Sequence, residues 1–482
     1  MGGVGSWPVV FGCCLALAAC SDAAPAADPE APLLPQVAPA GGPVMAHPAL
    51  VPIFFLGEPD AGELTRFSSW IVGSQWLAAV GTEYGVGAGS VLGAVDLMDG
   101  PDLSRDDKVV DLLFDALAMQ QIPRPADGDL SNVLYMVYLS PFQTITFRGS
   151  TSCVDFDGYH SSARRGGEEL VYAVIASCPA PNPGAGLQTR ESIASHELIE
   201  AATDPFPITR PAFRVTERTN PWVAFGGEVA DLCEVEGDPD WRENGFVAQR
   251  SWSNDAATAG RDPCVPGQDL YFNVSPSLRT APRIQRGDHL KMQLTAFASN
   301  AADGFSWSIE AHPITSHVPT LLLGTEKVHA GATTSLDIGI DAAAPNASSF
   351  RAFVESIGAS VRHILPMFVN VGPPCSTYST CETCAQQGGC GWCGTTGTCE
   401  AQDESGSGGS CPASSLATWP GSCSDFCAAH GDTCIDCSMQ VGCGWCDGDG
   451  APRCLEADRV SYQARDGSCS YASWSFTPSY CP

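Results

Sequence analysis

The sequence is poor in basic residues and has no long apolar run beyond its N-terminus. Its 482 residues include 24 Lys and Arg against 54 Asp and Glu, so the formal net charge is −30. Because a protein needs a basic surface to bind nucleic acid, this balance argues against nucleic acid as a partner. A membrane-spanning helix needs about 18 or more consecutive apolar residues, and none is predicted after the N-terminal segment.

Two enzyme motifs are also absent. The sequence contains no G-x-S-x-G motif, so a serine hydrolase of that type is not expected. The Gly-rich stretch GVGAGSVLG at 85–93 lacks the lysine of a P-loop, and we interpret it as a loop. Hydrophobic residues make up 44% of the chain and aromatic residues 9%, which is enough for folded cores. A length of 482 residues predicts several domains.

The N-terminus lacks the basic residues of an ordinary export signal, since the first Lys or Arg is Arg66. The apolar run over 1–19 nevertheless ends in LAAC at 17–20, which resembles a bacterial lipoprotein signal peptide. The resemblance implies that Cys20 is lipidated and anchors the protein to a bacterial membrane, at the outer membrane or the cell surface. An ordinary secretory signal with a chance cysteine is the alternative, and both predict export.

Composition divides the rest of the chain into a tether and several domains. Residues 20–46 are rich in Ala and Pro, which predicts an extended tether. Residues 47–267 alternate helical and strand patterns, which predicts an α/β or α+β domain. Residues 268–372 hold short alternating runs separated by turn residues, which is typical of an immunoglobulin-like β-sandwich. The predicted elements of 47–267 are strands at 51–57, 132–139 and 170–177 and helices at 64–85 and 106–121.

The C-terminal segment contains a duplication rich in cysteine. Of 23 cysteines, sixteen lie between 375 and 481, in two copies of eight, and each copy carries GCGWC. Only one histidine, His430, lies there, so we expect disulfides rather than zinc. The pattern resembles the PSI module of plexins, semaphorins and integrins, which implies a spacer role and small-core positions for Trp392 and Trp445. Two small disulfide-rich modules are therefore predicted, at 373–424 and 425–482.

A candidate metal site lies in HELIE at 196–200. A helix is expected over 189–202, capped by Thr189 or Ser192 and ending before Pro205. On this helix His196 and Glu200 lie one turn apart on one face, where imidazole nitrogen and carboxylate oxygen can both bind Zn²⁺. In H-E-x-x-H metalloproteases the Glu next to the first His activates water, which points to Glu197 as the base. Because a Glu replaces the second His, Ca²⁺ or Mn²⁺ is the alternative ion.

A third ligand is needed, and three acidic residues are candidates. Asp204 lies just beyond the expected helix end. Glu228 and Asp231 have E-x-x-D spacing and would share a face if they lay on one helical turn. In gluzincins a downstream helix supplies a Glu ligand, and Glu228 with Asp231 matches that arrangement by analogy only.

The surroundings of this stretch resemble a known family. A family of exported bacterial proteins has segments similar to SHELIEAATDP, EVADLCE and SCVDFDGYHSS. That family is distantly similar to the EXORDIUM/phosphate-induced proteins of plant cell walls. The resemblance covers about residues 50 to 266. It implies a zincin-like fold with a metal site at His196, Glu200 and the Glu228 region.

The remaining cysteines and one histidine belong to the same region. The four cysteines are even in number, and their order along the chain suggests the disulfides Cys153–Cys178 and Cys233–Cys264. His160, in GYHSS, is either a substrate-side residue near the metal or a structural histidine beside Cys153.

Three functions are compatible with these residues. The first is a metal hydrolase acting on a peptide, protein or cell-wall substrate, with Glu197 as general base. The second is a non-catalytic surface protein for adhesion or binding, with a vestigial metal site. The third is a purely structural metal or calcium clip.

Overall fold

The computed structural model of the chain describes most of residues 34–481, so Cys20 and the predicted signal peptide lie outside the described residues. The structure has several β-sheets and a disulfide-rich C-terminal part, and it is that of a multidomain, β-rich protein. The segments left out of the description between 34 and 482 are 98–101, 180–184, 216–221, 223–225, 235, 279–280, 303, 315–317, 345–348, 360, 403–410, 413–414, 449–450, 459–462, 471–472, 477–480 and 482.

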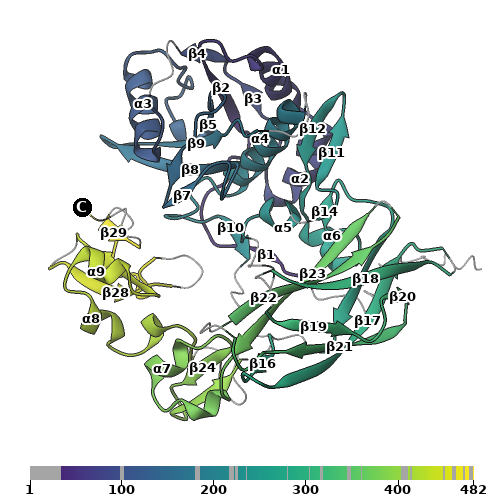
Figure 1. Cartoon of the computed structure of the whole chain (residues 1–482). Coiled ribbons are helices and arrows are strands. Elements are labelled where there is room, and N and C mark those ends of the chain that lie inside the picture. The colour runs from purple at the N-terminus through teal and green to yellow at the C-terminus, as the bar shows by residue number, and fades with distance from the viewer. Residues whose placement is uncertain are drawn as a thin grey trace, which may run out of the picture.

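A mixed sheet forms the centre of the first region (Figure 1). Its strands β2, β3, β4, β5 and β9 run parallel, and β8 joins β9 antiparallel at one end of the sheet. In the described part of the chain β8 pairs with no other strand, so its outer edge is unpaired. The bounds are β2 (Ala49–Phe55), β3 (Ser90–Val91), β4 (Val95–Leu97), β5 (Val133–Tyr138), β8 (Gly158–Arg165) and β9 (Glu168–Ile175).

Helices cover both faces of this sheet, which explains why its central strands are apolar throughout. Alternate residues of β2 enter two separate cores. Leu50 and Phe54 pack with α1, α2 and α4, whereas Val51 and Ile53 pack with α3. The helices are α1 (Ala61–Ile71), α2 (Gln75–Gly81), α3 (Asp106–Ala118) and α4 (Ala185–Thr203).

Two helix predictions need correction. The helix expected over 64–85 is two helices, because the first ends at Ile71 in a turn and the side chain of Ser74 caps the second by accepting from Leu77 N. Helix α4 begins at Ala185, so Thr189 and Ser192 lie inside it and do not cap it. The end of α4 at Thr203 agrees with the expected effect of the Asp-Pro sequence that follows.

The expected tether does not extend over residues 37–46. Strand β1 (Val37–Pro39) pairs with β10 (Phe213–Val215), and Met45 N donates to Ala202 O at 2.8 Å. Val37 and Met45 are fully buried. An Ala- and Pro-rich segment can therefore pack against a core when it carries a few large apolar side chains.

Smaller elements complete the first region. Segment 226–230 leads into α5, and the hairpin β11–β12 and the short strand pair β13–β14 follow it. These elements are β6 (Thr146–Phe147), β7 (Ser150–Thr151), α5 (Asp231–Glu234), β11 (Asp240–Glu243), β12 (Phe246–Gln249), β13 (Ser251–Trp252), α6 (Asn254–Thr258), β14 (Cys264–Val265) and the 3₁₀ turns η1 (Thr82–Tyr84) and η2 (Leu130–Asn132).

The second region contains two sheets that share one core. The first has the order β15-β17-β21-β19 and the second β16-β23-β22-β18-β20, and Phe272, Trp307 and Val354 meet between them. The strands are β15 (Tyr271–Pro276), β16 (Arg283–Ile284), β17 (His289–Ser299), β18 (Ser306–Pro313), β19 (Thr320–Leu323), β20 (Lys327–His329), β21 (Thr333–Gly339), β22 (Ser349–Ile357) and β23 (Arg362–Val371).

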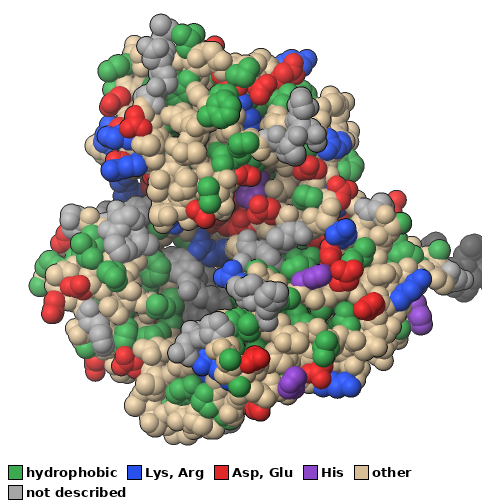
Figure 2. Space-filling model, in the orientation of Figure 1, with side chains coloured by type: hydrophobic (Ala, Val, Ile, Leu, Met, Phe, Trp, Pro, Cys, Tyr) green, Lys and Arg blue, Asp and Glu red, His purple; other side chains and the backbone are tan. Residues whose placement is uncertain are grey.

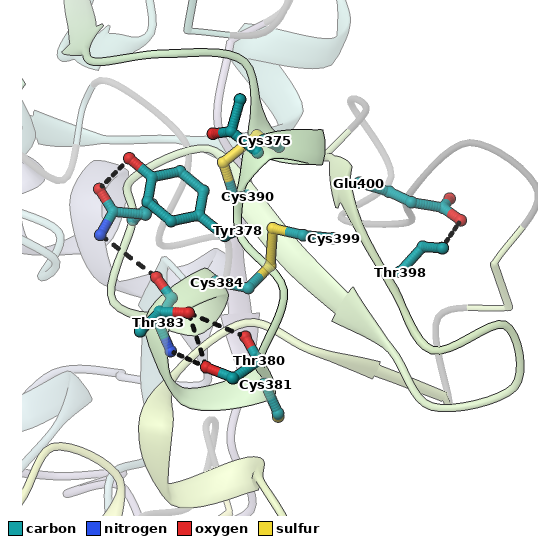
Figure 3. Close-up of a disulfide and its surroundings, with 12 residues drawn as sticks. Cys375, Tyr378, Thr380, Cys381, Thr383, Cys384, Cys390, Thr398, Cys399 and Glu400 are labelled. Carbon is teal, nitrogen blue, oxygen red and sulfur yellow. Dashed lines mark hydrogen bonds between the residues drawn. A yellow bond between two sulfur atoms is a disulfide. The ribbon is translucent and has the colours of Figure 1, made fainter.

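The C-terminal modules are two copies of one disulfide framework. When the eight cysteines of each module are numbered along the chain, the disulfides of both modules join the first to the fourth, the second to the eighth, the third to the sixth and the fifth to the seventh. In the first copy, Thr380 caps the short helix that carries two of the cysteines (Figure 3). The elements are η4 (Cys375–Thr377), α7 (Cys381–Ala385), β24 (Cys390–Cys393), β25 (Thr398–Ala401), β26 (Leu416–Ala417), η6 (Pro420–Ser422), α8 (Phe426–His430), α9 (Cys434–Ser438), β27 (Cys443–Cys446), β28 (Arg453–Glu456) and β29 (Trp474–Ser475).

Candidate metal centre

Helix α4 supplies the first residues of the site and is buried along its second half. Leu198, Ile199 and Ala202 enter the core beneath the sheet, while His196, Glu197 and Glu200 turn toward a cavity. The helix packs against β8, β9 and β12, so its polar residues are enclosed as well as its apolar ones. Glu197 is 4% exposed and Glu200 is 3% exposed. Carboxylates this deeply buried need a partner of opposite charge.

His196 and two carboxylates form a first group with the spacing of metal ligands. His196 Nε2 lies 3.2 Å from Glu200 Oε2 and 3.7 Å from Asp231 Oδ1. The three donor atoms lie within 4.8 Å of one another. Tetrahedral ligands with bonds of about 2.0 to 2.1 Å stand roughly 3.3 Å apart, so these distances suit a single ion. Asp231 is therefore the acidic residue that the fold brings to His196 and Glu200.

The hydrogen bonds of Gln249 fix the orientation of the His196 ring. Gln249 Nε2 donates to Ala230 O at 2.9 Å, which leaves Gln249 Oε1 as an acceptor. His196 Nδ1 lies 3.1 Å from this oxygen and must carry a proton to bond with it. In the neutral ring the lone pair on Nε2 then faces two carboxylates. That arrangement is repulsive unless a proton or a cation lies between them, and a metal-binding histidine is held in the same way.

Backbone amides hold the second oxygen of each carboxylate. Glu200 Oε1 accepts from Ala230 N at 3.2 Å and from Asp231 N at 3.1 Å. Asp231 Oδ2 accepts from Gly227 N at 3.1 Å. Gly226 has φ of +132°, and a Cβ there would lie 1.9 Å from Asp231 Oδ2, so the turn requires glycine. Each carboxylate is thus fixed by one oxygen and offers the other to the site.

Two expected ligands take other positions. Glu228 precedes α5 and does not share a helical turn with Asp231, because the chain folds back at 226–230 and the helix begins only at Asp231. Asp204 does not face His196. Its Oδ1 accepts from Ala212 N at 2.8 Å and its Oδ2 from Arg214 Nη2 at 3.2 Å, so it stabilises the loop after α4.

His160 belongs to the same cluster and is not simply a histidine beside a disulfide. It lies on β8, with Nδ1 3.5 Å from Glu197 Oε2 and 3.7 Å from Glu200 Oε2. Its Nε2 lies 3.1 Å from Asp204 O and 3.9 Å from Glu228 Oε1. Sequence spacing could not reveal this, because β8 joins α4 only through the folding of the sheet. The structure also bonds Cys153 to Cys178 and Cys233 to Cys264.

The charges of the cluster are poorly balanced. Burial would lower the pKa of His160, but the carboxylates of Glu228, Glu197 and Glu200 outweigh it and raise that pKa to about 10. Burial and the Glu200 carboxylate raise the pKa of Asp231 to about 8. Burial also raises the pKa of Glu197 and, more strongly, that of Glu228. Without a cation the cluster therefore retains protons at neutral pH, and a divalent cation would displace them.

The cluster lines a cavity of about 700 Å³. Phe147, Pro207, Ile208 and Val215 provide apolar wall, and the residues of the cluster line the same cavity. On the face drawn in Figure 2, Asp and Glu side chains gather with His and basic side chains in the hollow below the region of the mixed sheet. A small polar cluster beside an apolar wall is typical of a ligand site.

Comparisons with known proteins add little. No protein-family model and no curated protein match the chain. The crystal structure of the titin M3 domain aligns at a TM-score of 0.15 and 11% identity, over 22% of this chain and 97% of that chain. The extracellular region of plexin A4 aligns at a TM-score of 0.14 and 11% identity, over 25% of this chain and 14% of that chain. Likenesses this weak carry no argument about fold or function.

The disulfide bonds of the cysteines indicate the compartment in which the protein resides. Ten disulfides join cysteines in the described part of the chain, and bonds in this number indicate an extracellular or secreted protein. None of the described helices combines the length and the apolar character needed to cross a membrane.

Proposed function

We propose that the protein is an exported, lipid-anchored metal hydrolase that cleaves peptide-like substrates. His196, Glu200 and Asp231 would hold the cation, with Zn²⁺ as the first choice because a histidine and two carboxylates match its ligands. The supporting observation is the His196 ring, whose Nε2 faces two buried carboxylates while Gln249 holds its Nδ1. Ca²⁺ and Mn²⁺ remain the alternative ions, because two of the three ligands are oxygen donors.

Bound Zn²⁺ polarises a carbonyl group and lowers the pKa of water. The chain itself must supply a base, and Glu197 is suited to this role. It follows His196 on α4, lines the cavity and is almost fully buried. Burial raises its pKa toward neutrality, where a base is most effective. Glu197 Oε2 would accept a proton from the attacking water and later return it to the leaving group.

The neighbouring strand favours an extended peptide as substrate. Gly158, Tyr159 and His160 of β8 line the cavity, and β8 lies at the end of the sheet order. Peptides add to unpaired strand edges through backbone hydrogen bonds. A protein or a cell-wall peptide could lie along β8 with its scissile bond near His196 and Glu197.

The anchor and the C-terminal part fit a surface location. Lipidation of Cys20 would attach the chain to a bacterial membrane, and the zincin-like resemblance of residues 47–267 and the PSI-like pattern of the two repeats are compatible with a surface enzyme. A non-catalytic binding protein is the second candidate, because the β-sandwich and the disulfide repeats suit adhesion or spacing without any chemistry.

The decisive experiment compares hydrolysis of a mixed peptide pool by the full Zn²⁺-loaded chain and by Glu197→Gln. Loss of the base should lower the rate by on the order of 10²- to 10⁴-fold. Glu191→Gln is the matched control, since Glu191 is a buried carboxylate of α4 that accepts from Val247 N and does not line the cavity. Equal rates in the wild type and Glu197→Gln, or no cleavage in either, would favour the binding protein.

A further inference from the structure

We propose that His160, Glu197 and Glu200 form a second divalent-cation site next to the first. The two sites share Glu200, so this inference rests on the metal centre of the proposed function. A second ion would change the role of Glu197 from base to metal ligand.

The geometry of the second group matches that of the first. His160 Nδ1 lies 3.5 Å from Glu197 Oε2 and 3.7 Å from Glu200 Oε2, and the three donor atoms lie within 4.8 Å of one another. The same oxygen, Glu200 Oε2, lies 3.2 Å from His196 Nε2. A carboxylate between two imidazoles in this way can bridge two ions, and paired ions in hydrolases are about 3.5 to 4 Å apart.

The ring of His160 is oriented as a ligand. Its Nε2 lies 3.1 Å from the backbone oxygen of Asp204, which can only accept, so Nε2 carries the proton. Nδ1 is then free to bind an ion and points at Glu197 and Glu200. A backbone carbonyl that holds the far nitrogen is the usual outer partner of a metal-bound histidine.

Glu197 is aimed into the site and has His160 as its close basic neighbour. Its side chain is 5% exposed, and among the described residues no basic group other than His160 lies within 4.0 Å of it. The strand beside it leaves room for the carboxylate only because residue 158 is glycine: a Cβ there would lie 2.9 Å from Glu197 Oε1 and 2.5 Å from Ile193. A carboxylate held this tightly beside a histidine is preorganised for a cation.

Charge balance supports two ions rather than one. Glu197, Glu200, Glu228 and Asp231 line the cavity with His160 and His196. Arg148 and Arg214 also line it, but Arg148 is exposed and Arg214 pairs with Asp204, so neither neutralises the buried cluster. With neutral imidazoles, the four carboxylates carry four negative charges, which two divalent cations would neutralise. A single divalent cation would leave two of the four negative charges, and protons would have to balance them in the same cavity.

Glu197 cannot be a base and a ligand of the second ion at the same time, which has a consequence for activity. With one ion bound at His196, Glu200 and Asp231, Glu197 is free to act as a base. With both sites filled, Glu197 is a ligand and its proton-accepting oxygen is occupied. The protein should therefore lose activity when the metal concentration rises beyond that needed to fill the first site.

The test is equilibrium dialysis of the full chain against Zn²⁺ over a wide concentration range, with bound metal measured by mass spectrometry. The wild type should bind two ions in two steps. His160→Gln and Glu197→Gln should each bind one ion, and only the step at higher Zn²⁺ concentration should disappear. His363→Gln is the matched control, because His363 is a buried histidine paired with Glu236 away from the cavity, and it should keep both ions.

The outcomes separate this inference from the proposed function. One ion in the wild type that is lost in Asp231→Asn but kept in His160→Gln would overturn the second site and leave the first intact. No bound ion in any variant would overturn both. Two ions in His160→Gln and in Glu197→Gln, with circular dichroism spectra like the wild type, would also overturn the second site.

Discussion

Two regions of the molecule bury histidine beside carboxylate, and they differ in charge balance. Where the first region meets the second, His363 Nδ1 lies 3.1 Å from Glu236 Oε2, and the ring packs edge-on against Tyr271 and Phe272. One histidine faces one carboxylate there. In the cavity, two histidines lie among four carboxylates, while the lining arginines are exposed (Arg148) or paired with Asp204 (Arg214). A one-to-one pair matches one imidazole to one carboxylate, whereas the cavity has an excess of carboxylates that suits a cation.

Breaking the pair of His363 and Glu236 should have the largest effect on stability and none on the cavity. His363→Leu leaves the Glu236 carboxylate buried without its partner, which should lower the free energy of unfolding by about 3 to 5 kcal/mol. Urea denaturation measures this loss. Metal content and peptide hydrolysis of the folded variant should equal those of the wild type. A loss of bound metal in this variant would mean that the two regions are coupled and the comparison is wrong.

Removing the cation should affect only the unbalanced cluster. If the ion is present at 100 times its dissociation constant, chelation should lower the free energy of unfolding by about 2.7 kcal/mol. Thermal melts with and without chelator measure the difference. Asp231→Asn, which lacks one ligand, should respond much less to the chelator. An equal response of both proteins would place the stabilising ion elsewhere.

The smallest effect, counted per proton and per unit of pH, concerns the metal-free protein. The folded-state pKa of Asp231 is raised to about 8, so its stabilising contribution is present below about pH 4 and is lost as pH rises through 8. His160, raised to about 10, follows the same sign at higher pH. Each proton involved contributes about 1.4 kcal/mol per pH unit. Denaturation of chelated protein between pH 5 and 9 should show falling stability, and loading with Zn²⁺ should remove that fall, because the ion replaces the protons.

Part of this site could be predicted from the sequence. His196 and Glu200 are four residues apart, and helical periodicity alone brings them together. The end of the helix at Thr203 also follows from local sequence, because Pro205 restricts the residue before it. The repeated spacing of the C-terminal cysteines predicted two equal modules, and the identical disulfide order of the two copies agrees with that duplication.

The rest depends on contacts between distant segments. The choice of Asp231 over Asp204 and Glu228 follows from the turn at Gly226 and from backbone amides that hold the Glu200 carboxylate. His160 reaches the site because β8 pairs with β9 next to α4. Gln249, which orients His196, lies at the end of β12 and has no motif to mark it. None of these relations leaves a periodic signal along the chain.

The most direct test of the account is a crystal structure of the full chain grown with Zn²⁺, with anomalous diffraction recorded at the zinc edge. An anomalous peak is expected about 2.0 to 2.2 Å from His196 Nε2, Glu200 Oε2 and Asp231 Oδ1. The absence of any peak in the cavity, with those three side chains placed as they are here, would contradict it.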